Sequence, residues 1–316
     1  MIGLADVRRA REVVAPRIRR TPLIDAPDLT HRLGTAAYVK AECLQRTGSF
    51  KPRGATYAVA TLSETARRGG VVTMSAGNAA AAIAFAGREA GVPVTVVMPK
   101  AAPRAKVEAT RSFGAEVRFA EDVFGLLPIV RSLEAEGRYF LHPFDDDAMI
   151  AGHGTLALEV LEDLPEADLI VVGVGGGGLI AGIAAAAAGV RPGIRVVGVE
   201  PEGSPAMRRA LDAGHPVPLE RSSTVADALA APFAGDRPYE IASRLVEDVV
   251  LVGDDEILEG VRHIATRAKL VAEPGGAAAV GALLAGRVRV RPGERVVAVV
   301  SGGNVDPDRL AAILAA

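Results

Sequence analysis

Short apolar runs alternate with longer segments of helical period along most of the 316 residues. The runs are rich in valine and isoleucine, which is typical of buried strands in a parallel sheet. The longer segments are rich in alanine, with apolar residues three and four positions apart, which predicts helices. Strands are expected at 38–44, 71–74, 94–98, 116–119, 169–172, 196–199, 248–252 and 296–300. Helices are expected at 4–15, 51–68, 78–91, 104–113, 123–136, 152–163, 179–190, 204–213, 254–268, 274–285 and 307–315.

This alternation is the pattern of repeated βαβ units, and it predicts an α/β fold whose sheets are covered by helices on both faces. Two candidate site loops, at 75–79 and 175–179, each follow a strand and precede a helix. Ligands of open α/β sheets bind at the carboxyl ends of strands. Since the two loops are far apart along the chain, we expect a cleft between two lobes.

One uncharged segment, 169–190, has the length of a membrane span. It contains seven glycines, and four of them are consecutive, from Gly175 to Gly178. A strand, a glycine loop and a helix explain this segment better than a bilayer span, and no membrane partner is expected.

Composition narrows the function classes. Hydrophobic residues make up 49%, charged residues 23%, and the formal net charge is −2. This is the composition of a soluble globular protein, and without a basic stripe it argues against nucleic-acid binding. The single cysteine, Cys43, excludes an intrachain disulfide and a cysteine-based metal cluster. The N-terminus carries mixed charge and no signal-peptide pattern, so a cytoplasmic location is expected. The near-neutral charge favours a small molecule as the partner.

Lys51 stands out because only five of the 36 lysine and arginine residues are lysines. An arginine cannot lose its proton in a protein, whereas burial can lower the pKa of a lysine from about 10.4 until the amine is nucleophilic. Pro52 favours a helix that starts at this point. The spacing alone leaves a nucleophilic amine and an ordinary surface cation both open.

Three loops follow predicted strands. Residues 75–78 (Ser-Ala-Gly-Asn) open a helix, where backbone N–H groups can bind a carboxylate. Four glycines at 175–178 can form a nest of donors for one phosphate. Together with Gly173 and with Glu200 after the next strand, they also match a dinucleotide fingerprint, so an NAD-binding protein remains an alternative. Residues 301–304 (Ser-Gly-Gly-Asn) follow the last strand. Each loop alone also fits an ordinary turn.

Taken in order, the motifs resemble the fold-type II pyridoxal-phosphate enzymes, and most of all the threonine/serine dehydratase group. The similarity runs from about residue 20 to residue 306. It is carried by residues 49–55 (SFKPRGA), 75–78 (SAGN), 142–146 (HPFDD), 150–155 (IAGHGT), 175–179 (GGGGL), 273–274 (EP) and 301–304 (SGGN).

The resemblance implies two open, twisted, mostly parallel sheets of the tryptophan synthase β type. It implies a large cofactor-binding domain from 1–65 and 146–316, a small domain from 66–145, and an active site in the cleft between them. It also implies pyridoxal 5′-phosphate as cofactor, with an internal Schiff base on Lys51, which then serves as general base. The other implied cofactor contacts are Phe50, Asn78, Gly175, Gly176, Gly177, Gly178, Leu179 and Ser301. The implied substrate-carboxylate loop is Ser75, Ala76, Gly77, Asn78 and Ala79.

The implied reaction is α,β-elimination of water from L-threonine or L-serine, which gives a 2-oxo acid and ammonia. The neutral hydroxyl of Ser301 favours elimination over transamination. Other activities of the same family remain alternatives: β-replacement, racemisation, and dehydration of 3-hydroxyaspartate or phenylserine. A degenerate cofactor-binding module is the non-enzymatic alternative.

Several positions depart from the family pattern. Ala76 stands where racemase relatives have a serine, which disfavours racemisation. Glu200 matches the first ligand of a divalent-cation site, but Ala206 replaces the later aspartate, so Glu200 is a weak metal candidate and a bound cation is left open. His153 stands where many relatives have glutamine and receives no role. A homodimer or higher oligomer is usual among relatives. Because the chain ends soon after Asn304, neither a regulatory domain nor inhibition by isoleucine is expected.

Overall fold

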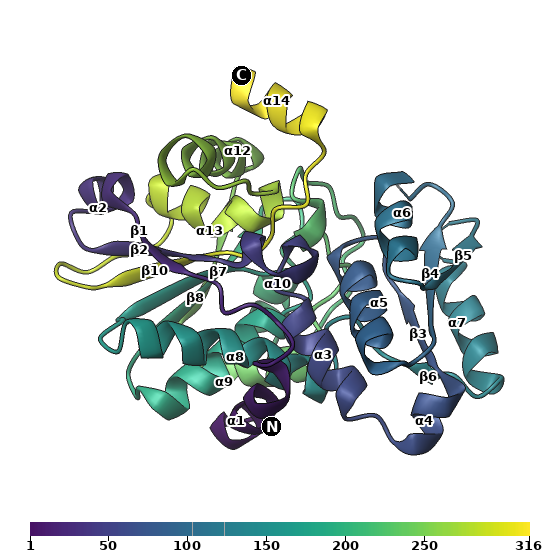
Figure 1. Ribbon diagram of the computed structural model, residues 1–316. Coiled ribbons are helices and arrows are strands. Elements are labelled where there is room, and N and C mark those ends of the chain that lie inside the picture. Colours follow the sequence, from purple (N-terminus) through teal and green to yellow (C-terminus); the bar gives the residue numbers. More distant parts are fainter. Residues whose placement is uncertain (103, 123) are drawn as a thin grey trace.

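A computed structural model describes residues 1–102, 104–122 and 124–316 (Figure 1). The strands in this part of the chain form two sheets. The large sheet has the order β1 (Leu23–Asp25), β2 (Ala37–Ala41), β10 (Val296–Val300), β7 (Leu169–Gly173), β8 (Arg195–Pro201) and β9 (Asp248–Val252). The small sheet has the order β5 (Glu116–Ala120), β4 (Val94–Pro99), β3 (Val71–Met74) and β6 (Tyr139–Phe140).

All pairs in both sheets are parallel except β1 with β2 at the edge of the large sheet. The seven strands expected from 71–74 onward are all present. Most are apolar runs that can bury both faces of a strand, whereas β5, at the edge of the small sheet, is largely exposed. The predicted fold of two open, mostly parallel sheets is confirmed.

Helices cover both faces of the large sheet, because successive strand residues point to opposite sides. In β7, Leu169 and Val171 pack in one hydrophobic cluster with α12 and α13, whereas Ile170 and Val172 pack in another with α8 and α9. The helices are α1 (Leu4–Val14), α2 (Pro27–Leu33), α3 (Pro52–Ala60), α4 (Glu64–Gly69), α5 (Asn78–Ala90), α6 (Arg104–Ser112), α7 (Leu126–Ala135), α8 (Asp147–Asp163), α9 (Gly178–Val190), α10 (Ala206–Ala213), α11 (Asp236–Leu245), α12 (Asp254–His263), α13 (Pro274–Leu284) and α14 (Pro307–Ala315).

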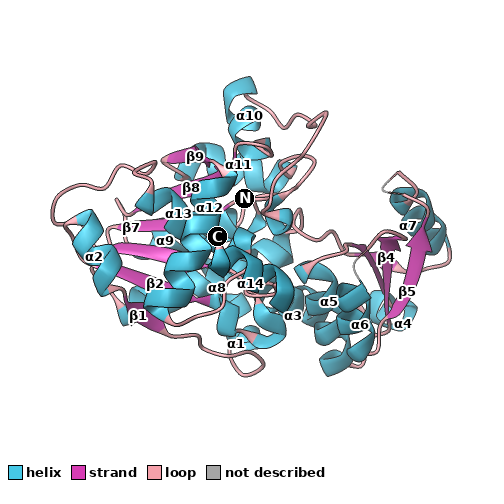
Figure 2. Cartoon of the chain, turned by 90° about the horizontal axis from the view of Figure 1, so that it is seen from above, coloured by secondary structure: helices cyan, strands magenta, loops and turns pink. Residues whose placement is uncertain are grey.

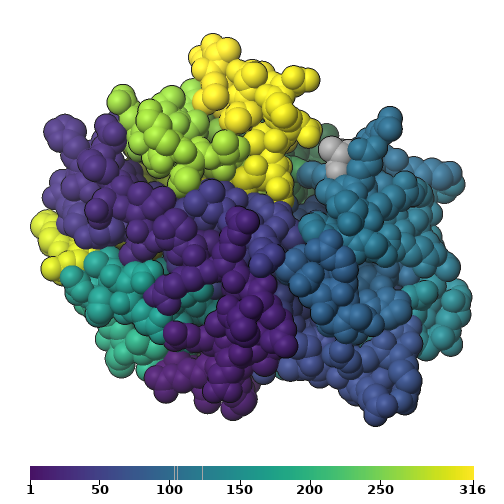
Figure 3. All heavy atoms as spheres, viewed as in Figure 1, coloured from purple at the N-terminus to yellow at the C-terminus, as the bar shows by residue number. Residues whose placement is uncertain are grey.

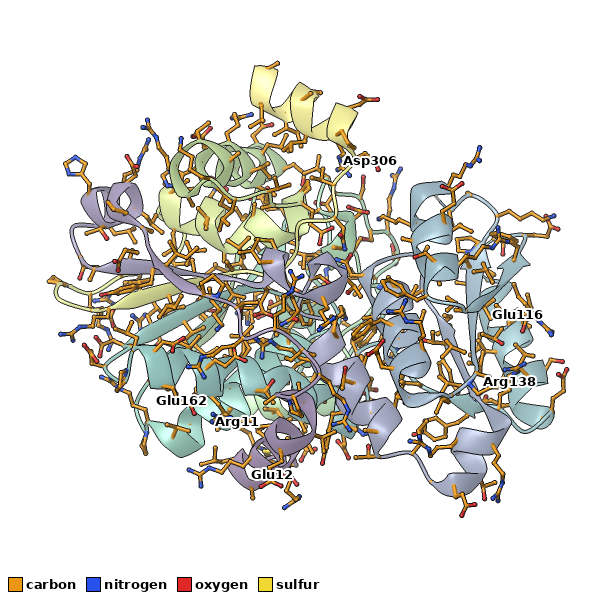
Figure 4. All side chains as sticks on the ribbon, viewed as in Figure 1. Arg11, Glu12, Glu116, Arg138, Glu162 and Asp306 are labelled. Atoms are coloured by element: carbon orange, nitrogen blue, oxygen red, sulfur yellow. The ribbon has the colours of Figure 1, made fainter. Side chains whose placement is uncertain are left out.

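The two sheets stand apart at opposite sides of the molecule, with α3 and α5 between them (Figure 2). In the space-filling view, the blue residues around the small sheet form one side, next to the purple N-terminal residues (Figure 3). In the large half, α1 is joined to α8 by an ion pair between Arg11 and Glu162 (Figure 4). None of the described helices is both long enough and apolar enough to cross a bilayer, and 169–190 forms β7, a loop and α9.

Some expected elements were wrong. The predicted helix 51–68 is two helices, because Ser63 caps α4 by accepting a hydrogen bond from Ala66 N at 3.2 Å. The strand expected at 38–44 ends at Ala41 and continues as a 3-10 turn. The helix expected from 152 begins at Asp147, since the Asp146 carboxylate accepts from Met149 N at 2.9 Å. The expected helix start at Val123 lies outside the described residues. The pattern missed β1, β6, α2 and α11, all of which are short or contain proline near their start.

Candidate active site

Lys51 lies at the entrance of α3, where the proline signal places it. Its Nζ donates a hydrogen bond to the carbonyl oxygen of Pro143 at 3.2 Å and lies 5.0 Å from the centre of the Phe50 ring. Burial lowers the pKa of Lys51 from 10.5 to about 8, so a sizeable fraction of the amine is neutral near neutral pH. This environment favours the nucleophilic amine over the surface cation.

The segment before Lys51 is joined to the carboxyl end of β10. Ser49 pairs with Gly302 in an isolated antiparallel bridge. The Phe50 N–H donates to the carbonyl oxygen of Ser301 at 3.0 Å. Ser301 itself is buried, with 6% exposure. The structure therefore holds Phe50, Lys51 and Ser301 beside one another, although they are 250 residues apart in sequence.

The four glycines form the turn between β7 and α9. Gly177 has φ +92°, a backbone conformation that favours glycine. A Cβ on Gly176 would lie 2.3 Å from the Phe144 ring, and one on Gly178 would lie 2.8 Å from the Phe144 carbonyl oxygen. Within the described chain, no acceptor is bonded to the backbone N–H groups of residues 175–179. These unpaired donors at the start of a 13-residue helix form a site for an anion.

Asn78 begins α5 and reaches across to the large half of the molecule. Its Nδ2 donates to Glu273 Oε1 at 2.6 Å, and its Oδ1 accepts from Asn304 Nδ2 at 2.8 Å. Burial raises the pKa of Glu273 to about 7, and the Asn78 hydrogen bond partly opposes this shift. Asn78 is thus oriented by two side chains and keeps one N–H hydrogen for a further acceptor.

The rest of the expected substrate loop lies around Asn78. Ser75 accepts a hydrogen bond from Gly77 N at 3.2 Å, which stabilises the turn between β3 and α5. Residues 75–77 are half-buried, and Ala79 is buried with 4% exposure. The loop therefore presents backbone rather than long side chains at the carboxyl end of β3.

A buried ionic cluster lies under the lysine helix. Arg53 donates to Glu42 and to Glu159 through four hydrogen bonds of 2.8 Å. Lys40 Nζ donates to Glu159 at 2.7 Å, and Thr21 bonds Glu42. Burial alone would lower the pKa of Arg53, but the two carboxylates raise it well above its usual value. The two positive and two negative charges satisfy one another and fix α3 in place.

Glu200 is placed by the structure as a helix cap. Its two carboxylate oxygens accept from Met207 N at 2.7 Å and from Arg208 N at 2.8 Å, in the first turn of α10. Glu200 is fully buried, so it offers no free oxygen to a ribose hydroxyl, and this removes the main support for the dinucleotide alternative. Among the described residues, no three metal-ligating side chains cluster.

Four functional contacts were missed by reasoning from the sequence: Pro143, Phe144, Glu273 and Asn304. Pro143 and Phe144 belong to a quoted motif that received no role, and Phe144 covers the glycine loop. Glu273 and Asn304 are themselves members of the motifs 273–274 and 301–304, so membership in a motif was the available signal. Both contact Asn78, which is more than 190 residues away from each of them in the sequence, and no local pattern reveals such a contact.

Comparison with known proteins identifies the family. A model for "Pyridoxal-phosphate dependent enzyme" matches residues 14–302. This chain belongs to that family. It is 40% identical to the L-threonine ammonia-lyase of Thermotoga maritima over 99% of this chain and 78% of that protein. It is 38% identical to the L-threonine dehydratase catabolic TdcB of Escherichia coli over 99% of this chain and 96% of that protein. The structure of maize serine racemase superposes with a TM-score of 0.94 at 34% identity, covering 98% of this chain and 96% of that one.

The site of this pyridoxal-phosphate enzyme fits its cofactor. The free N–H groups of residues 175–179 suit a phosphate, and a Cβ at Gly176 or Gly178 would displace the Phe144 segment that closes the cradle. Lys51 has a lowered pKa, which suits an amine that would bond the cofactor's aldehyde. The expected resemblance to threonine/serine dehydratases and the expected cofactor are confirmed.

Proposed function

We propose that this enzyme is a threonine/serine ammonia-lyase, with L-threonine as the preferred substrate. The single observation that supports this most is the desolvated Lys51 amine, which donates to the Pro143 carbonyl oxygen and follows Phe50, whose N–H bonds the Ser301 carbonyl oxygen. The ammonia-lyase of Thermotoga maritima and the dehydratase of Escherichia coli, which each match 99% of this chain, carry L-threonine in their names.

In this proposal the glycine loop with Leu179 holds the phosphate, Phe50 packs beside the ring, and Asn78 donates to the 3′-oxygen. Ser301 faces the pyridine nitrogen with a neutral hydroxyl, and Ser75 to Ala79 bind the substrate carboxylate through backbone N–H groups at the start of α5. The proposed large domain is 1–65 with 146–316, the small domain is 66–145, and the site lies between them.

The cofactor, when bound, supplies an electron sink for the charge that develops at the substrate α-carbon. Lys51 Nζ accepts the proton from that carbon, which requires a neutral amine at working pH. The β-hydroxyl then leaves as water with one proton, which balances the proton taken from the α-carbon. The released enamine moves a proton from its nitrogen to its β-carbon, water adds at the α-carbon and ammonia departs, so the net products are a 2-oxo acid and ammonia.

The test is release of 2-oxo acid from L-threonine, L-serine, 3-hydroxyaspartate and phenylserine. We expect the highest kcat/KM with L-threonine, and no release in Lys51→Ala. The matched control is Lys269→Ala, an exposed lysine elsewhere on the chain, which should behave as wild type. Equal rates from wild type and Lys51→Ala would disprove the proposal.

Serine racemisation is the second candidate, because a serine racemase shares this fold closely. Ala76 carries a methyl group, which cannot move a proton to the opposite face of the α-carbon. We therefore expect Ala76→Ser to raise the ratio of D-serine formed to pyruvate formed, measured by chiral chromatography. A wild-type enzyme that racemises serine faster than it deaminates it would reverse this preference.

We also propose that the enzyme is cytoplasmic and forms a homodimer or a higher homo-oligomer. Its single cysteine, which excludes an intrachain disulfide, supports the location. Light scattering on the purified protein measures its assembly directly.

A further inference from the structure

The helix that follows Lys51 begins without a side-chain cap of its own. Lys51 occupies the capping position and makes no capping hydrogen bond, and Pro52 has no N–H. Instead, the Gly54 N–H donates to Nδ1 of His153 at 3.1 Å. The cap of α3 therefore comes from the middle of α8, which leaves the lysine side chain free.

Two glycines allow this contact. A Cβ on Gly54 would lie 2.4 Å from His153 Cε1, and a Cβ on Gly152 would lie 2.4 Å from the Arg53 carbonyl oxygen. Because neither residue has a Cβ, the backbones of α3 and α8 touch along the first turn of α3. Only at this separation does the imidazole reach the Gly54 N–H.

The hydrogen bond also determines the form of the ring. Since Nδ1 accepts, the proton of His153 resides on Nε2 and the ring is neutral. Burial, and then the charges of Lys51 and Arg53, hold the pKa of His153 well below 6.5. Nε2 is buried and has no partner among the described residues. The ring also meets Phe50 edge-on, with centroids 4.8 Å apart and an interplanar angle of 71°.

We propose that His153 is a positioning residue for Lys51: as a neutral imidazole it caps α3 and, through Phe50, holds the lysine against the glycine loop. This inference rests on the proposed role of Lys51. An apolar side chain of similar size would fill the same space but would leave the buried Gly54 N–H without an acceptor, which is costly.

Two variants separate the cap from simple packing. His153→Asn keeps an acceptor at the position of Nδ1, whereas His153→Leu fills the space without one. In His153→Leu we expect hydrogen exchange of the Gly54 amide to be at least about tenfold faster, and the dissociation constant of pyridoxal phosphate to rise about tenfold. His153→Asn should stay within about twofold of wild type in both measurements. A His153→Leu protein that matches wild type in both would overturn the proposal.

The wild-type protein provides a second test that needs no folded leucine variant. The chain has five histidines, and the ¹⁵N signals of His153 are identified by their loss in His153→Asn. We expect the tautomer protonated at Nε2, unchanged from about pH 5 to about pH 9. A ring protonated at Nδ1, or a charged ring in that interval, would refute the cap. Neither test depends on turnover, so an enzyme without lyase activity would disprove the proposed function and leave this inference standing.

Discussion

The pKa of the Lys51 amine is the property on which the proposed chemistry depends most directly. Burial lowers it from 10.5 to about 8. At pH 7 a lysine with a pKa of about 8 is about 9% neutral, whereas one at 10.5 is about 0.03% neutral, a difference of about 300-fold. Because burial disfavours the ammonium form, raising the pH through about 8 should convert Lys51 from a protonated to a reactive amine well before an exposed lysine reacts.

The assay is competitive acylation of the cofactor-free protein at a series of pH values, followed by peptide mapping. With five lysines in the chain, every site can be followed at once. Lys269 is the exposed reference, and Lys40 is the buried and ion-paired one, which should resist acylation. We expect the acylation midpoint of Lys51 near pH 8, as its lowered pKa requires. A common midpoint for Lys51 and Lys269 would refute the argument that burial activates the amine.

Three substitutions test other parts of the structure. Arg53→Lys leaves carboxylate oxygens of the buried cluster without hydrogen-bond donors and should lower the free energy of unfolding, measured in urea, by about 3–5 kcal/mol. The matched control Arg104→Lys changes an exposed side chain and should leave the urea midpoint unchanged. Glu200→Ala removes the cap of α10 and should lower the free energy of unfolding in urea by about 2 kcal/mol. Dialysis of the wild type against a chelator should leave its melting temperature unchanged. Gly176→Ala places a Cβ 2.3 Å from the Phe144 ring, so the affinity for pyridoxal phosphate, followed by absorbance titration, should fall at least about tenfold; an unchanged affinity would mean that the cradle is not built as described.

The core of the fold was readable from local patterns. The apolar runs that form β7 and β10 are buried on both faces of the sheet. Every residue in such a strand is apolar, so the run can be recognised in the sequence alone. Lys51 could be singled out as a candidate from the sequence as well, because the chain otherwise uses arginine almost everywhere. The edge strand β1 and the two-residue strand β6 could not be predicted, because strands this short contain too few residues to show a hydrophobic period.

The contacts that tune the site were not readable for a different reason. The Glu273 carboxylate meets Asn78 across 195 residues, and Phe144 meets the glycine loop through a turn with no regular period. His153 sits among apolar residues of α8 and gives no local sign that its ring nitrogen will accept a hydrogen bond from another helix. Such pairings exist only once the two sheets are assembled.

The buried cluster of Lys40, Glu42, Arg53 and Glu159 sums to zero charge, and this constrains how the protein can diverge. Loss of one member leaves an opposite charge buried without a partner, so a single replacement lowers the stability of the fold. Replacement of an acid together with a base restores neutrality. These four positions should therefore drift as coupled pairs over evolutionary time, and a library that randomises them jointly should recover folded members enriched in balanced combinations.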